Sequence, residues 1–184
     1  MQRRVAILLA AGGGTRFQGA THKLLASLRD RPVYQWAIEH AVEADLEVWV
    51  ITGCAELEPI NDVEFVHNDQ WATGQASSLQ RAVAHARARG IDAFTVGLGD
   101  QPFVTSTTWR DVSDSTSPIA VANYHGVRGN PVRLSAEVWD LLPKEGDLGA
   151  RNLFAQRPDL VADIPSDGSS ADIDTLEDLQ RWNS

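Results

Sequence analysis

A glycine-rich segment near the N-terminus combines the residue types that bind phosphate groups. Residues 9–23 read LAAGGGTRFQGATHK and follow an apolar run at residues 5–9. Three successive glycines at 12–14 allow close approach of the backbone to a ligand and can aim several N–H groups at one anion. Arg16 and Lys23 add two positive charges to the same segment. The combination predicts a triphosphate-binding loop, although a glycine-rich segment can also simply connect two elements.

Two well-known phosphate-binding motifs do not fit this loop. A Walker loop ends in Gly-Lys-Ser/Thr, whereas Gly19 is followed by Ala20 and Thr21. A dinucleotide-binding fingerprint needs a third glycine at the position that Phe17 occupies here. The loop therefore indicates a different class of phosphate site.

Two aspartates could hold a divalent metal ion beside such a loop. Asp100 follows the apolar run 93–98 and precedes Gln101-Pro102. A carboxylate there suits Mg²⁺, which prefers oxygen ligands, but it could equally be a turn or capping residue. Asp174 lies just before the expected helix 176–182, where an N-cap role is a strong alternative. The residue types alone leave both assignments open.

Other polar residues could contact the base of a nucleotide or a second substrate. Gly74, Ser77 and Ser78 precede an expected helix. Their N–H and hydroxyl groups could reach a base, or Ser77 could simply cap the helix. Arg151 begins another expected helix, where it could reach an acceptor phosphate or form a surface ion pair.

The elements that must position these residues alternate along the chain. Apolar runs predict strands, and three- to four-residue apolar spacing with helix end signals predicts helices. The expected strands are residues 5–9, 48–52, 64–66, 93–98 and 119–123. The expected helices are 32–42, 77–89, 105–112, 136–142, 150–156 and 176–182, with an exposed loop at 111–118.

This alternation predicts an α/β fold. We expect one domain over residues 1–184, a Rossmann-like three-layer sandwich with a mostly parallel sheet and helices on both faces. Ligands of such sheets bind beyond the carboxyl ends of the strands. The glycine loop and Asp100 each follow an expected strand, so both should lie at the same edge of the sheet.

The composition excludes several classes of protein. The 184 residues carry a net charge of −9, so sequence-independent binding of nucleic acid is not expected. No segment approaches the roughly 18 apolar residues that a membrane span needs. Arg3-Arg4 is typical of a signal sequence, but Arg16 follows where a cleavage region should be. Cys54 is the only cysteine and is expected to be buried. These features predict a cytoplasmic protein.

The glycine loop and five later segments together resemble one family. The pattern LAAGxGTRF followed by Lys23 is similar to the signature of the MobA-like nucleotidyltransferases, in particular the branch of molybdenum cofactor cytidylyltransferases (MocA-like). The other matching segments are NDQWATG at 68–74 running into SSL at 77–79, GDQP at 99–102, RGNP at 128–131, GDLGAR at 146–151 and DIDT at 172–175. The resemblance spans nearly the whole chain.

The resemblance implies a role for each segment. It implies Arg16, Lys23 and Asp100 as catalytic residues, and Asp100 with Asp174 as Mg²⁺ ligands, with Asp172 the less favoured second ligand. The implied nucleotide-binding residues are Leu9, Ala10, Ala11, Gly12, Gly13, Gly14, Thr15, Arg16, Lys23, Gly74, Ser77, Ser78 and Asp100. The implied acceptor-binding residues are Gln101, Asn130, Pro131, Asp147, Gly149 and Arg151.

The implied reaction transfers CMP from CTP to the phosphate of the molybdenum cofactor (molybdopterin), with Mg²⁺ as cofactor and pyrophosphate as the second product. A molybdenum hydroxylase apoenzyme would be a partner. Ala10-Ala11 before the glycines is similar to the cytidine-preferring form of the family, but the loop has Gly-Thr-Arg-Phe where Ser-x-Arg-Met is more usual. A GTP-dependent guanylyltransferase of the same family is therefore one alternative. A cofactor-binding chaperone with little turnover is another.

Overall fold

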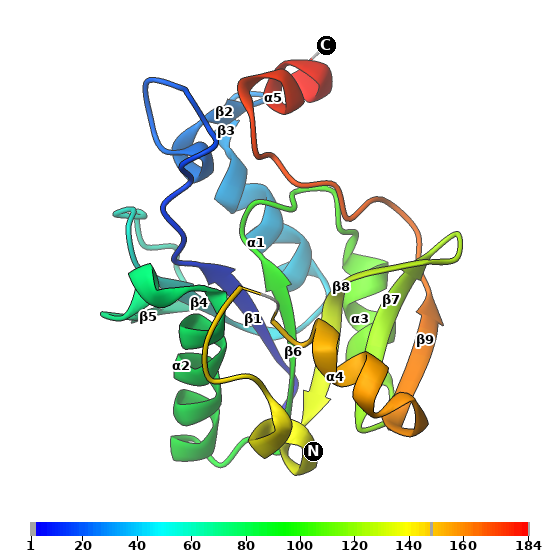
Figure 1. The fold of residues 1–184 in the computed structure, drawn as a ribbon. Helices are drawn as coiled ribbons and strands as arrows, with labels where there is room; N and C mark the ends of the chain where they lie inside the picture. Colours follow the sequence, from blue (N-terminus) through cyan, green and yellow to red (C-terminus); the bar gives the residue numbers. More distant parts are fainter. Residues whose placement is uncertain (1–2, 148, 184) are drawn as a thin grey trace.

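The central sheet has the strand order β5-β4-β1-β6-β8-β7-β9 (Figure 1). The structure is a computed structural model that describes residues 3–147 and 149–183. The strands are β1 (Val5–Ala10), β4 (Glu47–Thr52), β5 (Val63–His67), β6 (Ala93–Leu98), β7 (Ile119–Tyr124), β8 (Val127–Ser135) and β9 (Val161–Pro165). Among the described residues, β8 is antiparallel to its neighbours β6 and β7, and all other strand pairs of this sheet are parallel. The expected mostly parallel sheet is therefore confirmed.

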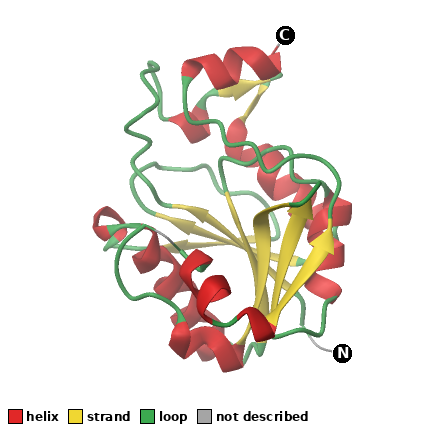
Figure 2. Cartoon of the chain, turned by 45° about the vertical axis from the view of Figure 1, so that its right-hand side comes forward, coloured by secondary structure: helices red, strands yellow, loops and turns green. Residues whose placement is uncertain are grey.

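Helices cover both faces of the sheet (Figure 2). The α-helices are α1 (Val33–Glu43), α2 (Gln75–Ala88), α3 (Ser106–Asp114), α4 (Arg151–Gln156) and α5 (Leu176–Asn183). The 3-10 helices are η1 (Lys23–Leu25), η2 (Trp71–Thr73), η3 (Ala136–Leu141) and η4 (Pro158–Leu160). A short hairpin, β2 (Ser27–Leu28) with β3 (Arg31–Pro32), lies apart from the main sheet and near α5. In the described part of the chain, no helix is long and apolar enough to cross a membrane.

Alternating side chains of β1 show how the three layers form. Val5 and Ile7 pack in the cluster that includes residues of α2, η3 and α4. Ala6 and Leu8 point to the opposite face and pack with residues of α1 and α3. A strand covered on both faces must be apolar throughout, which is why the run VAILLA is such a clear signal. The three-layer α/β arrangement is therefore confirmed.

Several local expectations are wrong. β8 and β9 are absent from the expected strands. The helix expected at residues 136–142 is present, as the 3-10 helix η3. The expected exposed loop 111–118 begins with the last turn of α3, and Val112 is buried against the sheet. Cys54, expected to be buried, is exposed.

The carboxyl ends of the parallel strands bring the glycine loop and Asp100 together. Leu9 of β1 lies opposite Leu98 of β6 in the parallel ladder. The Gly99 N–H donates a hydrogen bond to the Leu9 carbonyl at 2.9 Å. The two segments that follow these strands therefore start side by side at one edge of the sheet, as the topology predicts.

Candidate active site

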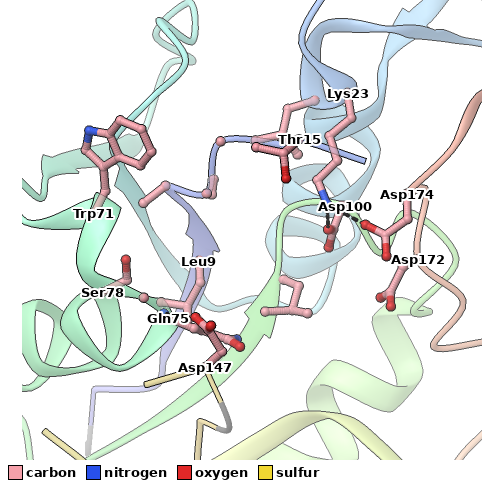
Figure 3. A pocket seen from close by; sticks show the side chains of 18 of the residues that line it. Leu9, Thr15, Lys23, Trp71, Gln75, Ser78, Asp100, Asp147, Asp172 and Asp174 are labelled. Carbon is pink, nitrogen blue, oxygen red and sulfur yellow. Dashed lines mark hydrogen bonds and ion pairs between the residues drawn. The ribbon is translucent and has the colours of Figure 1, made fainter. Parts of the chain in front are cut away.

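A cavity of about 790 Å³ opens at this edge of the sheet (Figure 3). Its volume is in the usual range for small-molecule sites. The lining residues are Leu9, Ala10, Ala11, Gly12, Gly13, Gly14, Thr15, Arg16, Lys23, Leu24, Trp71, Ala72, Thr73, Gly74, Gln75, Ser78, Leu98, Asp100, Asp147, Arg151, Asp172 and Asp174. The cavity thus brings residues 9–16 and Lys23 of the glycine loop together with residues more than 150 positions away.

The glycine loop is held in a fixed shape by a histidine. Gly14 has φ +61°, a left-handed conformation that favours glycine, and a Cβ there would lie 3.0 Å from His22 Nε2. His22 Nε2 is 2.9 Å from the Gly12 carbonyl, and its Nδ1 accepts a hydrogen bond from the Leu24 N–H. A carbonyl only accepts, so Nε2 carries the proton. Burial lowers the pKa of His22, which favours this neutral form.

One end of the cavity is a cluster of charged side chains. Lys23 Nζ lies 2.5 Å from Asp100 Oδ2 and 2.7 Å from Asp174 Oδ1, between the two carboxylates (Figure 3). These three side chains are 13–17% exposed. Burial alone would lower the pKa of Lys23, but the charges and hydrogen bonds of Asp100 and Asp174 outweigh it and raise the pKa. The lysine therefore stays an ammonium ion.

Arg16 joins the same cluster and lies on its solvent-exposed side. Its guanidinium is 2.8 Å from Asp174 Oδ2, and its side chain is 76% exposed. Asp174 is thus paired with one buried and one exposed cation. Four residues from three separate segments meet here, as the implied catalytic and metal-binding roles require.

The helix that follows Asp174 does not use it as a cap. Thr175 Oγ1 accepts a hydrogen bond from the Asp178 N–H at 3.1 Å, and Asp178 Oδ2 accepts from the Thr175 N–H at 2.9 Å. This reciprocal pair is a capping box, with Thr175 in the N-cap role. The alternative that Asp174 merely caps α5 is therefore wrong, and its carboxylate is available to the cavity.

The residues present fit a divalent metal ion. Asp100 Oδ1 is buried and has no hydrogen-bond partner among the described residues. A buried carboxylate oxygen without a partner is costly unless a ligand satisfies it. Within residues 3–147 and 149–183 there is no group of three or more His, Cys, Asp or Glu side chains placed to hold a metal. Mg²⁺ commonly binds through only one or two carboxylates together with substrate phosphates, so Asp100 and Asp174 are sufficient.

A third aspartate lies beside this pair but has different partners. Asp172 Oδ1 accepts a hydrogen bond of 2.6 Å from Gln101 Nε2. Burial and the nearby Asp100 raise the pKa of Asp172. Gln101 is itself 5% exposed, and its Oε1 accepts a hydrogen bond of 3.0 Å from Asn130 Nδ2. Gln101 therefore joins the carboxylate cluster to β8.

The other end of the cavity is uncharged apart from Asp147 and Arg151. Gly74 precedes α2 with φ +114°, and the Gln75 N–H donates to Asp147 Oδ1 at 3.1 Å. Ser78 lines the cavity, next to Trp71 and Gln75 (Figure 3).

The two serines predicted to contact the nucleotide differ in their surroundings. Ser77 is not among the lining residues, because its hydroxyl donates back to the Gln70 and Gly74 carbonyls. The buried Asn68 donates to both serine hydroxyls at 3.0 Å and so fixes the start of α2.

The predicted acceptor residues are divided among three places. A second cavity of about 170 Å³ adjoins the first and is lined by Leu9, Gln75, Leu79, Val96, Leu98, Val121, Arg128, Gly129, Asn130, Val132, Gly149, Ala150, Arg151 and Phe154. Asn130, Gly149 and Arg151 line it, whereas Asp147 lines the larger cavity. Gln101 and Pro131 line neither cavity and are buried. Leu148 of the GDLGAR segment lies outside the described residues.

Arg151 lines both cavities, so it lies where they meet. It forms no ion pair with any residue described in the structure, so the alternative of a surface ion pair is not observed.

Several lining residues of the cavities were not predicted, among them Gln75, Trp71, Arg128 and Phe154. Gln75 follows Gly74 directly, so the motif position could have pointed to it. Trp71 belongs to the NDQWATG segment, where an aromatic residue among polar ones was a weak signal. Arg128 and Phe154 line the second cavity. Phe154 has no local signal, because its spacing on α4 is equally typical of a core residue.

Comparisons with known proteins agree with this geometry. Residues 6–161 match the MobA-like NTP transferase domain. The bifunctional protein GlmU of Agrobacterium fabrum is 28% identical over 137 residues, covering 66% of this chain and 29% of GlmU. The chain thus spans less than a third of the length of this curated relative.

Solved structures match over nearly the whole chain. Rv0371c from Mycobacterium tuberculosis H37Rv has a TM-score of 0.84 and 26% identity, covering 99% of this chain and 98% of that one. Its complex with manganese has a TM-score of 0.78 and 26% identity, covering 98% of both chains. A nucleotidyl transferase from Methanothermobacter shares the fold, with a TM-score of 0.82 and 24% identity over 98% of this chain and 96% of that one. With the family match running from β1 to the start of β9, the chain belongs to the MobA-like NTP transferase family.

Proposed function

We propose that the chain is a metal-dependent nucleotidyltransferase that transfers CMP from CTP to the phosphate of the molybdenum cofactor and releases pyrophosphate. The observation that carries the proposal is the cluster in which Lys23 lies between Asp100 and Asp174 at the end of the glycine loop. A cytoplasmic location, and a molybdenum hydroxylase apoenzyme as recipient of the product, belong to the same proposal.

The reaction needs no nucleophile from the protein. An oxygen of the acceptor phosphate attacks the α-phosphorus of CTP in line, and the bond between that phosphorus and the oxygen bridging to the β-phosphate breaks. The electron pair of the broken bond leaves with pyrophosphate. Because the acceptor phosphate is already an anion, catalysis comes from positioning and from neutralising charge.

The residues of the charged end would divide this work. The N–H groups of Gly12, Gly13 and Gly14 and the Arg16 side chain would hold the β- and γ-phosphates, as the loop shape suits. Lys23 would move from its carboxylate partners to the charge that develops at the α-phosphate. A divalent ion held by Asp100 and Asp174, with Mg²⁺ as the expected ion, would neutralise phosphate charge when bound. The manganese complex of Rv0371c supports a divalent metal in a similar protein.

The part of the cavity away from Lys23, Asp100 and Asp174 would hold the base. Ala10, Ala11, Gly74 and Ser78 are among the residues that line the cavity. Rigid backbone donors and acceptors distinguish bases because a mismatched base leaves buried polar groups unpaired. The Ala-Ala sequence supports CTP by its resemblance to the cytidine-preferring form.

The second cavity would hold the acceptor. It shares Leu9, Gln75, Leu98 and Arg151 with the larger cavity, so the two ligands would be neighbours. Arg151 could bind the acceptor phosphate at the junction, since a guanidinium matches the geometry of a phosphate. Gln101 and Pro131 would support Asn130 from behind.

The proposal is tested by measuring pyrophosphate release from CTP, GTP and ATP with molybdopterin as acceptor. Release from CTP alone, abolished in Asp100→Asn, is the expected result. Pyrophosphate release from GTP instead of CTP would support the same transfer mechanism but would make the chain a guanylyltransferase. Tight acceptor binding without pyrophosphate release from any nucleotide would contradict the proposal in favour of a cofactor-carrying chaperone.

A further inference from the structure

We propose that Lys23 competes with the divalent ion for Asp100 and Asp174, so that the metal ion enters the site together with the nucleotide and not before it. The inference rests on the metal-dependent transferase proposed above. It concerns how this chain's own lysine controls access to the two carboxylates.

The carboxylate oxygens of the cluster are almost all engaged. Lys23 Nζ donates to Asp100 Oδ2 and to Asp174 Oδ1, at 2.5 and 2.7 Å. Arg16 occupies Asp174 Oδ2 at 2.8 Å. Of the four oxygens of Asp100 and Asp174, Asp100 Oδ1 is the one without a partner among the described residues. A metal ion arriving alone would therefore find a single uncommitted oxygen in this pair.

The burial of the cluster makes this competition strong. Lys23 and Asp100 are 13% and 14% exposed, so their ion pair is screened far less than a surface pair. Displacing Lys23 without offering it another anion would leave a charge buried without its partner, which is costly. The remaining carboxylate, Asp172, does not offer a displaced Lys23 a free partner, since Gln101 Nε2 already donates a hydrogen bond to its Oδ1 at 2.6 Å.

A nucleotide changes this balance because it brings new anions to the same cavity. The glycine loop and Lys23 line one wall together, and a Cβ on Gly14 would lie only 3.3 Å from Lys23 Cγ. Phosphates bound by the loop would thus lie within reach of the ammonium group and of Arg16. When the two cations turn to the phosphates, Asp100 Oδ2 and both Asp174 oxygens become free for the metal. By linkage, nucleotide and metal must then raise each other's affinity by the same factor.

The test is a titration of the protein with Mn²⁺ in the absence of nucleotide, in which electron paramagnetic resonance measures the concentration of free Mn²⁺. Lys23→Met should bind Mn²⁺ at least about tenfold more tightly than the wild type, since it loses a buried competing charge. Lys144→Met is the matched control, because it removes the only other lysine of the sequence, an exposed one, with the same change in net charge. The control should bind Mn²⁺ like the wild type. Adding Asp100→Asn to Lys23→Met should abolish the gain and so locate the ion.

A second titration separates this inference from the proposed function. Saturating CTP should raise the Mn²⁺ affinity of the wild type more than that of Lys23→Met. Equal Mn²⁺ affinities of the wild type and Lys23→Met without nucleotide would overturn the inference, and metal-dependent CTP binding by the wild type would still support the transferase. Absence of CTP binding at any Mn²⁺ concentration would instead contradict the transferase itself.

If circular dichroism shows that Lys23→Met is unfolded, Arg16→Gln serves as a second test variant. Arg16 is 76% exposed, so Arg16→Gln should fold, and it frees Asp174 Oδ2. It should raise the affinity for Mn²⁺ alone by a smaller factor, about twofold to threefold, because an exposed pair is weaker. No gain in Arg16→Gln would then overturn the inference.

Discussion

The parallel half of the sheet and its mixed half contribute different things to the candidate site. The parallel half, β5-β4-β1-β6, ends in the glycine loop and in Asp100, where Lys23 pairs with Asp100, whereas Asp174, the other partner of Lys23, follows β9 of the mixed half. The mixed half, β8-β7-β9, contributes Asn130 and apolar side chains of the small second cavity, including Val121 and Val132. Under the proposed function, the phosphates of the nucleotide would bind where the parallel strands end together, and the mixed half would shape the cavity for the acceptor.

The two halves are joined by the pairing of β6 with β8 and, beside the site, also by a buried amide. Gln101 follows β6, donates to Asp172 and accepts from Asn130 of β8. Under the proposed function, the nucleotide binds to the parallel half and the acceptor to the cavity of the mixed half. The comparison therefore predicts that substitutions in one half change one substrate's behaviour, whereas changes at Gln101 affect both.

The largest effect is expected from Lys23→Ala in the parallel half. Turnover should fall about 100- to 1,000-fold, the usual loss when one group that stabilises the transition state is removed. The dissociation constant for CTP should change far less, because the loop and Arg16 still bind phosphates. Pyrophosphate release and calorimetry measure the two quantities, with Lys144→Ala as the control. Unchanged turnover would remove Lys23 from the chemistry.

The next effect is expected from Gln101→Leu, which breaks the link between the halves. Asn130 Nδ2 and Asp172 Oδ1 both lose a hydrogen-bond partner. Because Asn130 is half-buried and Asp172 is exposed, each lost hydrogen bond should cost about 0.5–1.5 kcal/mol. Urea unfolding should show this loss of stability, and apparent affinities for both substrates should weaken. Gln80→Leu is the control, since half-buried Gln80 of α2 donates only to the backbone of the 142–143 segment. An equal, small loss in both variants would contradict the linking role.

A smaller effect is expected from Arg151→Gln at the junction of the cavities. The KM for the phosphorylated acceptor should rise about tenfold, the loss of one charge-assisted hydrogen bond, while kcat changes little. Arg157→Gln is the control, because Arg157 pairs with Asp159 and lines neither cavity. A rise in the KM for CTP without any change for the acceptor would move Arg151 to the nucleotide side.

The smallest effect is expected at the outer edge of the mixed half. Arg128 lies 2.7 Å from both Asp163 oxygens, and these hydrogen bonds lower the pKa of Asp163. A lowered pKa stabilises the folded protein above the unfolded value of about 4, and the gain is lost as pH falls through the folded value. Because both side chains are about 40% exposed, Asp163→Asn should cost less than about 1 kcal/mol at pH 7. Unfolding experiments at pH 7 and near pH 3 should show a larger difference at pH 7 than at pH 3.

The strands of the parallel half could be predicted well from the sequence because each is identified by a short apolar run. β1, β4 and β6 are buried on both faces and read as unbroken apolar runs, so their ends could be placed within one residue. The glycine loop and Asp100 follow these strands directly. Their meeting at one edge therefore followed from topology before any side-chain contact was known.

Of the three strands of the mixed half, β7 was predicted, but β8 and β9 were missed because their signals are weak. β8 contains Gly129, Asn130 and Pro131, residues that are uncommon within strands, and its pairing with β6 and β7 overrides their preferences. β9 is a short edge strand interrupted by Asp163. The partners of Lys23 lie 77 and 151 positions away, so resemblance, and not local pattern, implied that Asp174 belongs to the cluster.

Calorimetric binding of CTP, GTP and ATP, each with and without Mg²⁺, would show whether the cavity is the site of a metal-dependent cytidylyltransferase. We expect binding that depends on Mg²⁺, favours CTP and is lost in Asp100→Asn. Binding of no nucleotide at concentrations above about 1 mM, the upper end of usual substrate affinities, would contradict it.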